Sequence, residues 1–290
     1  MLLSVVLITF NEEANIARTL QSVAPLVQQG RGEIIVVDSG STDRTLEIAQ
    51  SLGARVFSEE WKGFAAQKNS ALAKASGEWV LSLDADEELS NELAEDIEQV
   101  LADSAPGAPQ PRSAVAYWIP RRNYFLGRWT RHGGFWPDDK LRLFRRGAAQ
   151  FKHTPVHETI EVLPPAKGLP IAYGHLPGHL LHYSYPTLSS YIEHMNRYSS
   201  LGAEMAAAKG HGAFSFSNIV LRPAATFIYN YFFRLGFLDG KEGLLLHLYH
   251  ASYVSWKYAK AWERSRPWCQ NPVPSDTDWA SKIPSHCWIR

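Results

Sequence analysis

Four acidic side chains directly follow an apolar run in the first third of the chain. The run is 79–83, and the acids are Asp84, Asp86, Glu87 and Glu88. In an extended segment Asp84 and Asp86 point to the same side, because side chains alternate along a strand. Two carboxylates around one small residue suit Mg²⁺ or Mn²⁺, hard ions that take further ligands from water and substrate phosphates. A solvated acidic turn has the same composition, so both interpretations stay open.

A calcium loop of the EF-hand type is a further interpretation of these acids. Asp84, Asp86, Glu88 and Glu95 stand at its first, third, fifth and twelfth positions. Leu89, however, stands at the sixth position, which requires glycine, and a strand precedes the loop where a helix is needed. We therefore set the EF-hand interpretation aside.

The first hundred residues alternate between apolar strands and helices. Strands are expected at 4–10, 33–38, 55–57 and 79–83. Such uniformly apolar strands, separated by helices, indicate a parallel sheet that is covered on both faces. Ligands bind beyond the carboxyl ends of the strands in sheets of this kind. Three polar side chains come just past such ends, which predicts an active site there: Asn11, Asp38 and Asp84.

Local signals also indicate where the helices begin. Asn11 is a candidate N-cap, with Glu12 and Glu13 in the first turn, where acids favour the helix dipole. Glu87 and Glu88 are expected to be capping or solvated acids ahead of a helix at 91–101.

Composition limits the class of protein. The chain has 290 residues, 45% of them hydrophobic, and a formal net charge of zero, which gives no general argument for binding nucleic acid. Cys269 and Cys287 form neither a disulfide framework nor a zinc spacing, which favours a reducing, cytosolic compartment. The first residues are expected to form a strand and not a signal peptide. No uncharged apolar run reaches the ~18–20 residues of a membrane span.

Basic residues gather in the middle of the chain. They predict a positive surface that faces phosphates or an anionic bilayer, or else a solvated face. The cluster consists of Arg121, Arg122, Arg128, Arg131, Lys140, Arg142, Arg145, Arg146 and Lys152.

Three motifs occur in order, each at the end of an expected strand: VVLITFNEE at 5–13, VVDSGSTD at 36–43 and LSLDADE at 81–87. Together they resemble glycosyltransferase family 2, inverting enzymes of the GT-A fold that use nucleotide-diphospho sugars. The segments WKGFAAQKN, RLFRR, VHE and GFLDGKEG resemble a narrower group, the lipopolysaccharide core β-glucosyltransferases of the WaaE type. The implied fold is α/β, a Rossmann-like and mostly parallel GT-A sheet with a C-terminal helical extension.

The resemblance implies roles for residues near the strand ends. Thr9, Asn11 and Glu12 would line the nucleotide pocket, and Asp38 would bind the base or the ribose. Lys68 would reach a phosphate or the base, with a solvated helix lysine as the alternative.

A divalent cation, Mg²⁺ or Mn²⁺, is the implied cofactor. Asp86 would be its principal ligand, and Asp84 would contact the ribose or complete the metal's shell. The ion stabilises the charge that builds on the departing diphosphate. Arg142 would bridge that diphosphate with its planar guanidinium group.

An inverting transfer also needs a carboxylate that deprotonates the acceptor hydroxyl. The resemblance implies Glu158 as this base, with Asp138 and Asp139 as alternatives. Many family members have an acidic pair at this point, whereas this chain has His157 before Glu158. His157 would ligate the metal, orient Glu158 or be an ordinary loop histidine.

The composition changes along the chain and predicts its domains. Residues 1–184 are expected to form the GT-A domain, with a nucleotide-binding half at 1–102 and an acceptor half at 114–184. Residues 185–265 would be a helical extension, and 266–290 an irregular tail. Within the extension, 219–237 and 244–254 are apolar and aromatic, so they either lie in a membrane interface or pack on the core as a helical hairpin.

These observations predict a metal-dependent inverting glycosyltransferase. It would move a sugar, glucose by resemblance, from a nucleotide-diphospho sugar (a UDP-sugar is favoured) to a lipid-linked or lipopolysaccharide-core acceptor. It would act in the cytoplasm, at the face of the inner membrane. The alternatives are a sugar-phosphate nucleotidylyltransferase, which would need a glycine-rich loop after the first strand, and a non-catalytic GT-A-like protein that binds the membrane surface.

Overall fold

The computed structural model describes residues 1–104, 114–152, 159–163 and 172–266. Its contacts divide the chain into two units. The first unit comprises Met1–Ile192 and Ile228–His247, and the second comprises Glu193–Phe227 and Leu248–Arg290. Residues of the predicted helical extension, 185–265, therefore belong to both units.

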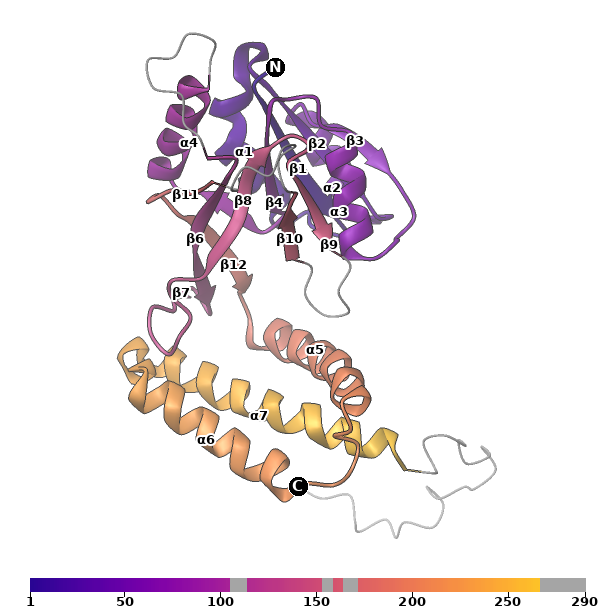
Figure 1. Cartoon of the computed structure of the whole chain (residues 1–290), viewed down its shortest axis with the longest axis vertical. Coiled ribbons are helices and arrows are strands. Elements are labelled where there is room, and N and C mark those ends of the chain that lie inside the picture. Colours follow the sequence, from indigo (N-terminus) through magenta and orange to yellow (C-terminus); the bar gives the residue numbers. More distant parts are fainter. Residues whose placement is uncertain (105–113, 153–158, 164–171, 267–290) are drawn as a thin grey trace. The chain divides into compact units, whose positions relative to one another are not determined.

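A mixed sheet of ten strands forms the centre of the first unit (Figure 1). Its strands are β1 (Leu3–Thr9), β2 (Gly32–Asp38), β3 (Arg55–Ser58), β4 (Trp79–Asp84), β5 (Glu87–Leu89), β6 (Ala116–Phe125), β7 (Arg128–Trp129), β8 (Asp139–Arg145), β11 (Tyr173–His175) and β12 (Leu180–Tyr185). The path through it is β3-β2-β1-β4-β8-β6-β12-β5, with β7 and β11 paired to β6. The first four strands of the path are mutually parallel, and β8 is antiparallel to β4. The predicted alternation of apolar strands and helices is confirmed.

Helices cover both faces of this sheet, which explains why its central strands are apolar throughout. The helices of this half are α1 (Ile16–Val27), α2 (Thr45–Ser51), α3 (Phe64–Ala73) and α4 (Asn91–Asp103). Residues of α1, α2 and α4 join one core cluster. Residues of α3 join the other, together with the antiparallel strands β9 (Ala149–Lys152) and β10 (Thr159–Val162). Strands buried on both sides are typical of parallel sheets.

The strand register brings the predicted polar residues to one edge. Thr9, the last residue of β1, lies opposite Asp38 of β2, and Ile8 lies opposite Asp84 of β4. The carboxyl ends of β2 and β4 therefore flank the carboxyl end of β1. The predicted convergence of Asn11, Asp38 and Asp84 follows from this register.

The first helix begins later than the sequence signals suggest. Asn11 does not cap it, because α1 begins at Ile16 with Asn15 at the N-cap position. Asn11 instead has a left-handed backbone with φ of 55°, and its side-chain oxygen accepts a hydrogen bond from the Thr42 backbone N–H (2.8 Å). The Asn11 side chain therefore joins the loop after β1 to the loop after β2 and does not cap the helix.

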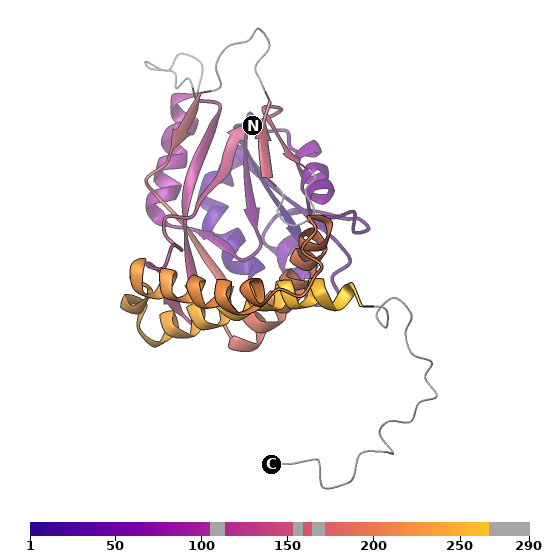
Figure 2. The ribbon, with the colours of Figure 1, turned by 60° about the horizontal axis from the view of Figure 1, so that its bottom comes forward.

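The second unit is helical. It contains most of α5 (Leu188–Ala208), most of α6 (Arg222–Ile228) and the later part of α7 (Gly240–Arg264). Within it, 217–227 runs alongside 248–264 (Figure 2), and the Ser255 hydroxyl donates to the Ile219 carbonyl (2.8 Å). None of the described helices combines the length and the apolar character that a membrane crossing requires.

Candidate active site

Asp84, at the end of β4, lies among buried cations. Lys68 of α3 donates to its Oδ1 (2.8 Å), and the Arg142 guanidinium of β8 donates to its Oδ2. Both cations are almost completely buried. Burial by itself raises the pKa of Asp84, but Arg142 and Lys68 hold that pKa well below its usual range. These ion pairs therefore favour the ionised form of Asp84, which accepts hydrogen bonds or binds a cation.

Glu87 corrects the expectation that it is a capping or solvated acid. Its side chain is fully buried in β5, where it accepts from the Asp84 backbone N–H (3.0 Å). Arg121 and Arg142 also donate to its Oε1, at 2.9 and 2.7 Å. Because β5 pairs with β12, the segment after Asp86 is a strand before the helix begins. Glu87 thus serves as the counter-ion of two arginines.

Arg121 extends this network to the loop before β8. It donates to Glu87 and also to Asp138, at 2.8 Å from Oδ2. Burial acts to raise the pKa of Asp138, but Arg121, with hydrogen bonds from Lys140 and Asn123, lowers it to about 2. A carboxylate this acidic is a weak proton acceptor, which argues against Asp138 as the catalytic base.

Asp86 has a partner that sequence reasoning missed. Nε2 of His182, on β12, lies 3.2 Å from Oδ2 of Asp86. Burial acts to raise the pKa of Asp86, but the neighbouring His182 lowers it. Nδ1 of His182 lies 2.7 Å from the Asn123 side-chain oxygen and equally close to the Ser184 hydroxyl. When Nδ1–H is donated to Asn123, Nε2 is the nitrogen left to bind an ion beside Asp86, the division of roles found in metal-binding histidines.

The predicted nucleotide residues Thr9, Asn11 and Asp38 form a neighbouring group. Asp38 is fully buried and accepts from the Thr9 hydroxyl (2.9 Å), from the Ser41 hydroxyl and from the backbone N–H groups of Gly40 and Ser41. The Asn11 backbone N–H donates to the Ser41 hydroxyl (2.8 Å). These contacts order the loop after β2 against the loop after β1.

Glu12 contacts the first residue of α2 and is influenced by the charges of Asp84 and Asp86. Its backbone N–H donates to the Thr45 hydroxyl, and its carboxylate accepts from the Asn15 amide (2.9 Å). Burial raises the pKa of Glu12, and the negative charges of Asp86, Asp43 and Asp84 add to the rise. The predicted residues Glu12, Asp84 and Asp86 therefore influence one another electrostatically.

The structure thus brings Glu12, Lys68, Asp84, Asp86 and Arg142 into one site, with Thr9, Asn11 and Asp38 beside it. The predicted base Glu158 and the predicted ligand His157 lie outside the described residues. Within the described part of the chain there is no cluster of three or more His, Cys, Asp or Glu side chains arranged to hold a metal. An ion at Asp86 and His182 would have to complete its shell with water and substrate oxygens.

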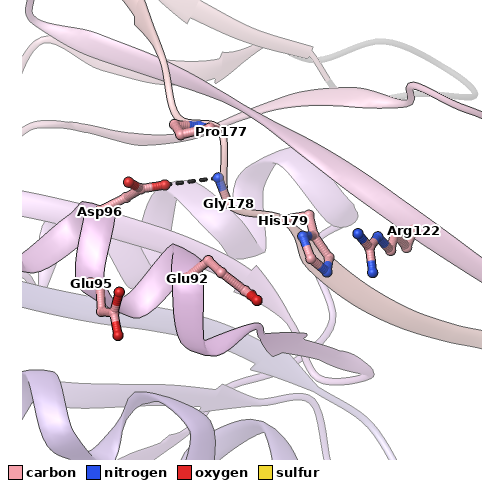
Figure 3. A pocket seen from close by; sticks show the side chains of 7 residues that line it. All are labelled: Glu92, Glu95, Asp96, Arg122, Pro177, Gly178 and His179. Atoms are coloured by element: carbon pink, nitrogen blue, oxygen red, sulfur yellow. Dashed lines mark hydrogen bonds between the residues drawn. The ribbon is translucent and has the colours of Figure 1, made fainter.

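A separate hollow of about 400 Å³ lies on the other side of β6. Neighbouring residues of a strand point to opposite faces, so Arg121 meets the acids while Arg122 faces this hollow. Figure 3 shows its lining, where the Gly178 backbone N–H donates to Asp96 (2.8 Å). The lining residues are Glu92, Glu95, Asp96, Arg122, Pro177, Gly178 and His179.

Comparison with known proteins places the chain in a family. The family model described as "Glycosyl transferase family 2" matches residues 4–160, more than half of the chain. An uncharacterised glycosyltransferase of Rickettsia typhi is 33% identical over 280 residues, which are 94% of this chain and 91% of that protein. The lipopolysaccharide core biosynthesis glycosyltransferase LpsC of Rhizobium meliloti is 30% identical over 277 residues, 90% of this chain and 92% of LpsC.

Among solved structures, residues 1–349 of TarS from S. aureus in complex with UDP are 18% identical, with a TM-score of 0.44 and 91% of each chain covered. That likeness is too distant to add to the assignment. The family match and the observed α/β sheet confirm the GT-A fold expected from the three strand-end motifs. The chain belongs to glycosyltransferase family 2 and is a glycosyltransferase.

Proposed function

We propose that the chain is a metal-dependent, inverting enzyme that transfers a hexose, glucose by analogy, from a UDP-sugar to a hydroxyl of a lipid-linked or lipopolysaccharide-core saccharide. The observation that carries the metal-dependent donor site is the pairing of Asp86 with His182 beside the anionic Asp84. The similarity to LpsC, a lipopolysaccharide core biosynthesis glycosyltransferase, supports the acceptor class.

The donor set fits a hard divalent cation. Asp86 supplies a carboxylate, and His182 supplies an imidazole whose other nitrogen lies against Asn123 and Ser184. Two protein ligands suit Mg²⁺ or Mn²⁺, which keep waters and accept diphosphate oxygens. When bound there, the ion neutralises charge on the leaving diphosphate. In this proposal His182 takes the ligand role that the sequence suggested for His157.

The buried cations prepare the site before substrate arrives. Lys68 and Arg142 keep Asp84 ionised, so it stands ready to accept from a ribose hydroxyl or to complete the metal shell. In the proposal the Arg142 guanidinium, which already meets two carboxylates, also contacts an incoming diphosphate. Thr9, Asn11, Glu12 and the loop ordered by Asp38 receive the nucleoside.

The catalytic base is proposed to be Glu158. The low pKa of Asp138 makes that alternative a poor proton acceptor near neutral pH. Asp138 instead holds Arg121, and Arg121 holds Glu87. In this assignment the Asp138 carboxylate positions the cationic network, while Glu158 removes the proton of the acceptor hydroxyl.

The proposed place of action is the cytoplasmic face of the inner membrane, where a lipid-linked acceptor is presented. Two observations support it. The chain resembles a lipopolysaccharide core enzyme over 90% of its length, and its C-terminal segments expose many large apolar side chains.

A panel of nucleotide sugars, assayed for hydrolysis with and without Mn²⁺, tests the reaction class and names the donor. We expect metal-dependent hydrolysis that is lost in Asp86→Asn and in His182→Ala. His179→Ala is the matched control, because His179 lies three residues earlier and faces the separate hollow. Full hydrolysis by His182→Ala at limiting Mn²⁺ would remove this residue from the metal site.

The base assignment has its own test. In Glu158→Gln, transfer to an acceptor should collapse while UDP binding persists, because the substitution leaves the donor site intact. Transfer at the wild-type rate would move the base role to another carboxylate.

A further inference from the structure

A segment of the first unit exposes large apolar side chains in unusual number. It is Ile228–His247, called the aromatic segment below. Phe233 is 74% exposed, Tyr229 57% and Phe232 53%, and Ile228, Leu235 and Leu238 are each nearly half exposed. Single exposed apolar residues are normal, but a concentration of them marks an interaction site.

The backbone of the aromatic segment is fixed in place. The Asp239 carboxylate accepts from both the backbone N–H and the ring Nδ1 of His132, each at 2.8 Å. The Gly133 backbone N–H donates to the Arg234 carbonyl (2.8 Å), and the Arg234 guanidinium occupies the space that a side chain at Gly134 would need. The exposed aromatic side chains therefore stand on an anchored scaffold.

The acidic and basic side chains near these aromatic residues differ in their exposure to solvent. The acidic side chains of the segment are largely buried: Asp239 is 4% exposed and Glu242 17%. The basic side chains in and beside the segment are more exposed: Lys241 is 88% exposed and Arg128 48%, with the Glu242 carboxylate 4.0 and 3.8 Å away, and Arg234 is exposed as well. The surface is therefore apolar and aromatic within a positive surround.

We propose that the aromatic segment docks on an anionic lipid bilayer, with its aromatic side chains in the headgroup region and its basic side chains against lipid phosphates. Amphipathic segments rich in aromatic and basic residues bind in this way, lying in the interface without crossing the bilayer. No described helix is fit to cross it. A second copy of the chain is a poorer occupant, because a two-fold contact would set positive surface against positive surface.

The proposal rests on the proposed function for its purpose, since a lipid-linked acceptor lies where the segment would bind. The His132 contact also connects the segment to the chain between β7 and β8, which leads to Asp138 and through it to Arg121. The chain from His132 to Asp138 and the hydrogen bonds at its two ends would thus link the donor site to the docked segment.

Vesicle co-sedimentation of the full chain tests the docking. We expect binding to vesicles of phosphatidylcholine with phosphatidylglycerol, little binding to phosphatidylcholine alone, and weaker binding as salt rises. The double variant F233S/L238S should bind about tenfold more weakly, because two apolar side chains no longer enter the interface. Lys241→Gln should lose about fivefold on the anionic vesicles. Tyr173→Ser, at an aromatic residue of β11 that is 48% exposed, is the matched control and should bind normally.

Two outcomes overturn the proposal. One is a vesicle-binding result in which F233S/L238S and the wild-type chain do not differ, whether both bind or neither does. The other is a dimer in sedimentation velocity that F233S/L238S abolishes, which would make a second copy the partner. UDP binding with Mn²⁺, measured without vesicles, tests the proposed donor site independently of the membrane docking. If UDP binding persists while vesicle binding fails, only the docking proposal is rejected.

Discussion

The end of β4 buries charged side chains, whereas the aromatic segment exposes apolar ones. At the end of β4, Asp84 and Glu87 meet Lys68, Arg121 and Arg142 in a largely buried network. In Ile228–His247 many large apolar side chains are exposed, while the two acids are largely buried. Buried ion pairs are poor stabilisers, and exposed aromatic side chains are poor solutes, so neither arrangement is explained by folding alone. The first suits a charged ligand, and the second suits an apolar environment.

The largest effect is expected when the proposed metal ligand Asp86, beside the buried network at the end of β4, is replaced. Asp86→Asn removes the carboxylate beside His182 and should lower the turnover number by about 10³-fold or more, since metal stabilisation of a leaving group contributes several kcal/mol. Glu98→Gln, on the exposed face of α4, is the control and should keep its rate. The measurement is kcat for donor hydrolysis at saturating Mn²⁺. A wild-type kcat in Asp86→Asn would place the leaving-group site elsewhere.

The next effect separates two neighbouring glutamates. Glu87→Gln leaves Arg121 and Arg142 without a full counter-ion and should cost about 3 kcal/mol in the free energy of unfolding. Glu88→Gln weakens a partly exposed pair with Arg18 and alters a hydrogen bond with the Tyr183 side chain, and it should cost less than about 1 kcal/mol. Urea unfolding of the two variants checks the difference. Equal losses would contradict the buried-network description.

The buried network that includes Arg121 and Asp138 should also determine how the free energy of unfolding falls at low pH. The pKa of Asp138 is about 2 in the folded chain against 3.8 for the ordinary side chain, so its stabilisation is complete above about pH 4 and is lost as the pH falls toward 2. Asp138→Asn should therefore lose less stability between pH 4 and pH 2 than the wild type loses. Urea midpoints at several pH values test this. Identical acid slopes for both proteins would speak against the network around Arg121.

The smallest effect is expected in the aromatic segment. Phe233→Ser should change the free energy of unfolding without lipid by no more than about 0.5 kcal/mol, because the side chain is 74% exposed. Leu83→Ala in the core is the contrast, with a loss of about 3 kcal/mol. A loss in Phe233→Ser as large as in Leu83→Ala would mean that this aromatic ring belongs to the core.

The local sequence pattern was sufficient to predict the strands and the helix that position the site residues. Runs of apolar residues marked β1, β2 and β4, and the strand-end positions of Asp38 and Asp84 followed from the geometry of parallel sheets. Helix α4 begins at Asn91, as expected, with the Ser90 hydroxyl accepting from the Leu93 N–H. These features depend on neighbours in sequence, which a single sequence displays.

The local sequence pattern could not predict contacts between segments that are distant in the chain. His182 lies on β12, far along the chain from Asp86, and no spacing connects the two. Glu87 looked like a helix-start acid because its burial depends on β12 and on arginines of β6 and β8. Asn11 was expected at a helix cap, yet a contact with the loop after β2 claims its side chain. In each case a tertiary partner overrode a local preference.

The most direct test of the donor site is calorimetric titration of UDP into the wild type, Asp86→Asn and His182→Ala, each with Mn²⁺ and with the metal chelated. The wild type should bind UDP more tightly with Mn²⁺, and that gain should disappear in both variants because each removes one of the two protein ligands. Equal UDP affinity of the wild type with and without metal, or a full Mn²⁺ gain in both variants, would contradict a metal-diphosphate site at Asp86 and His182.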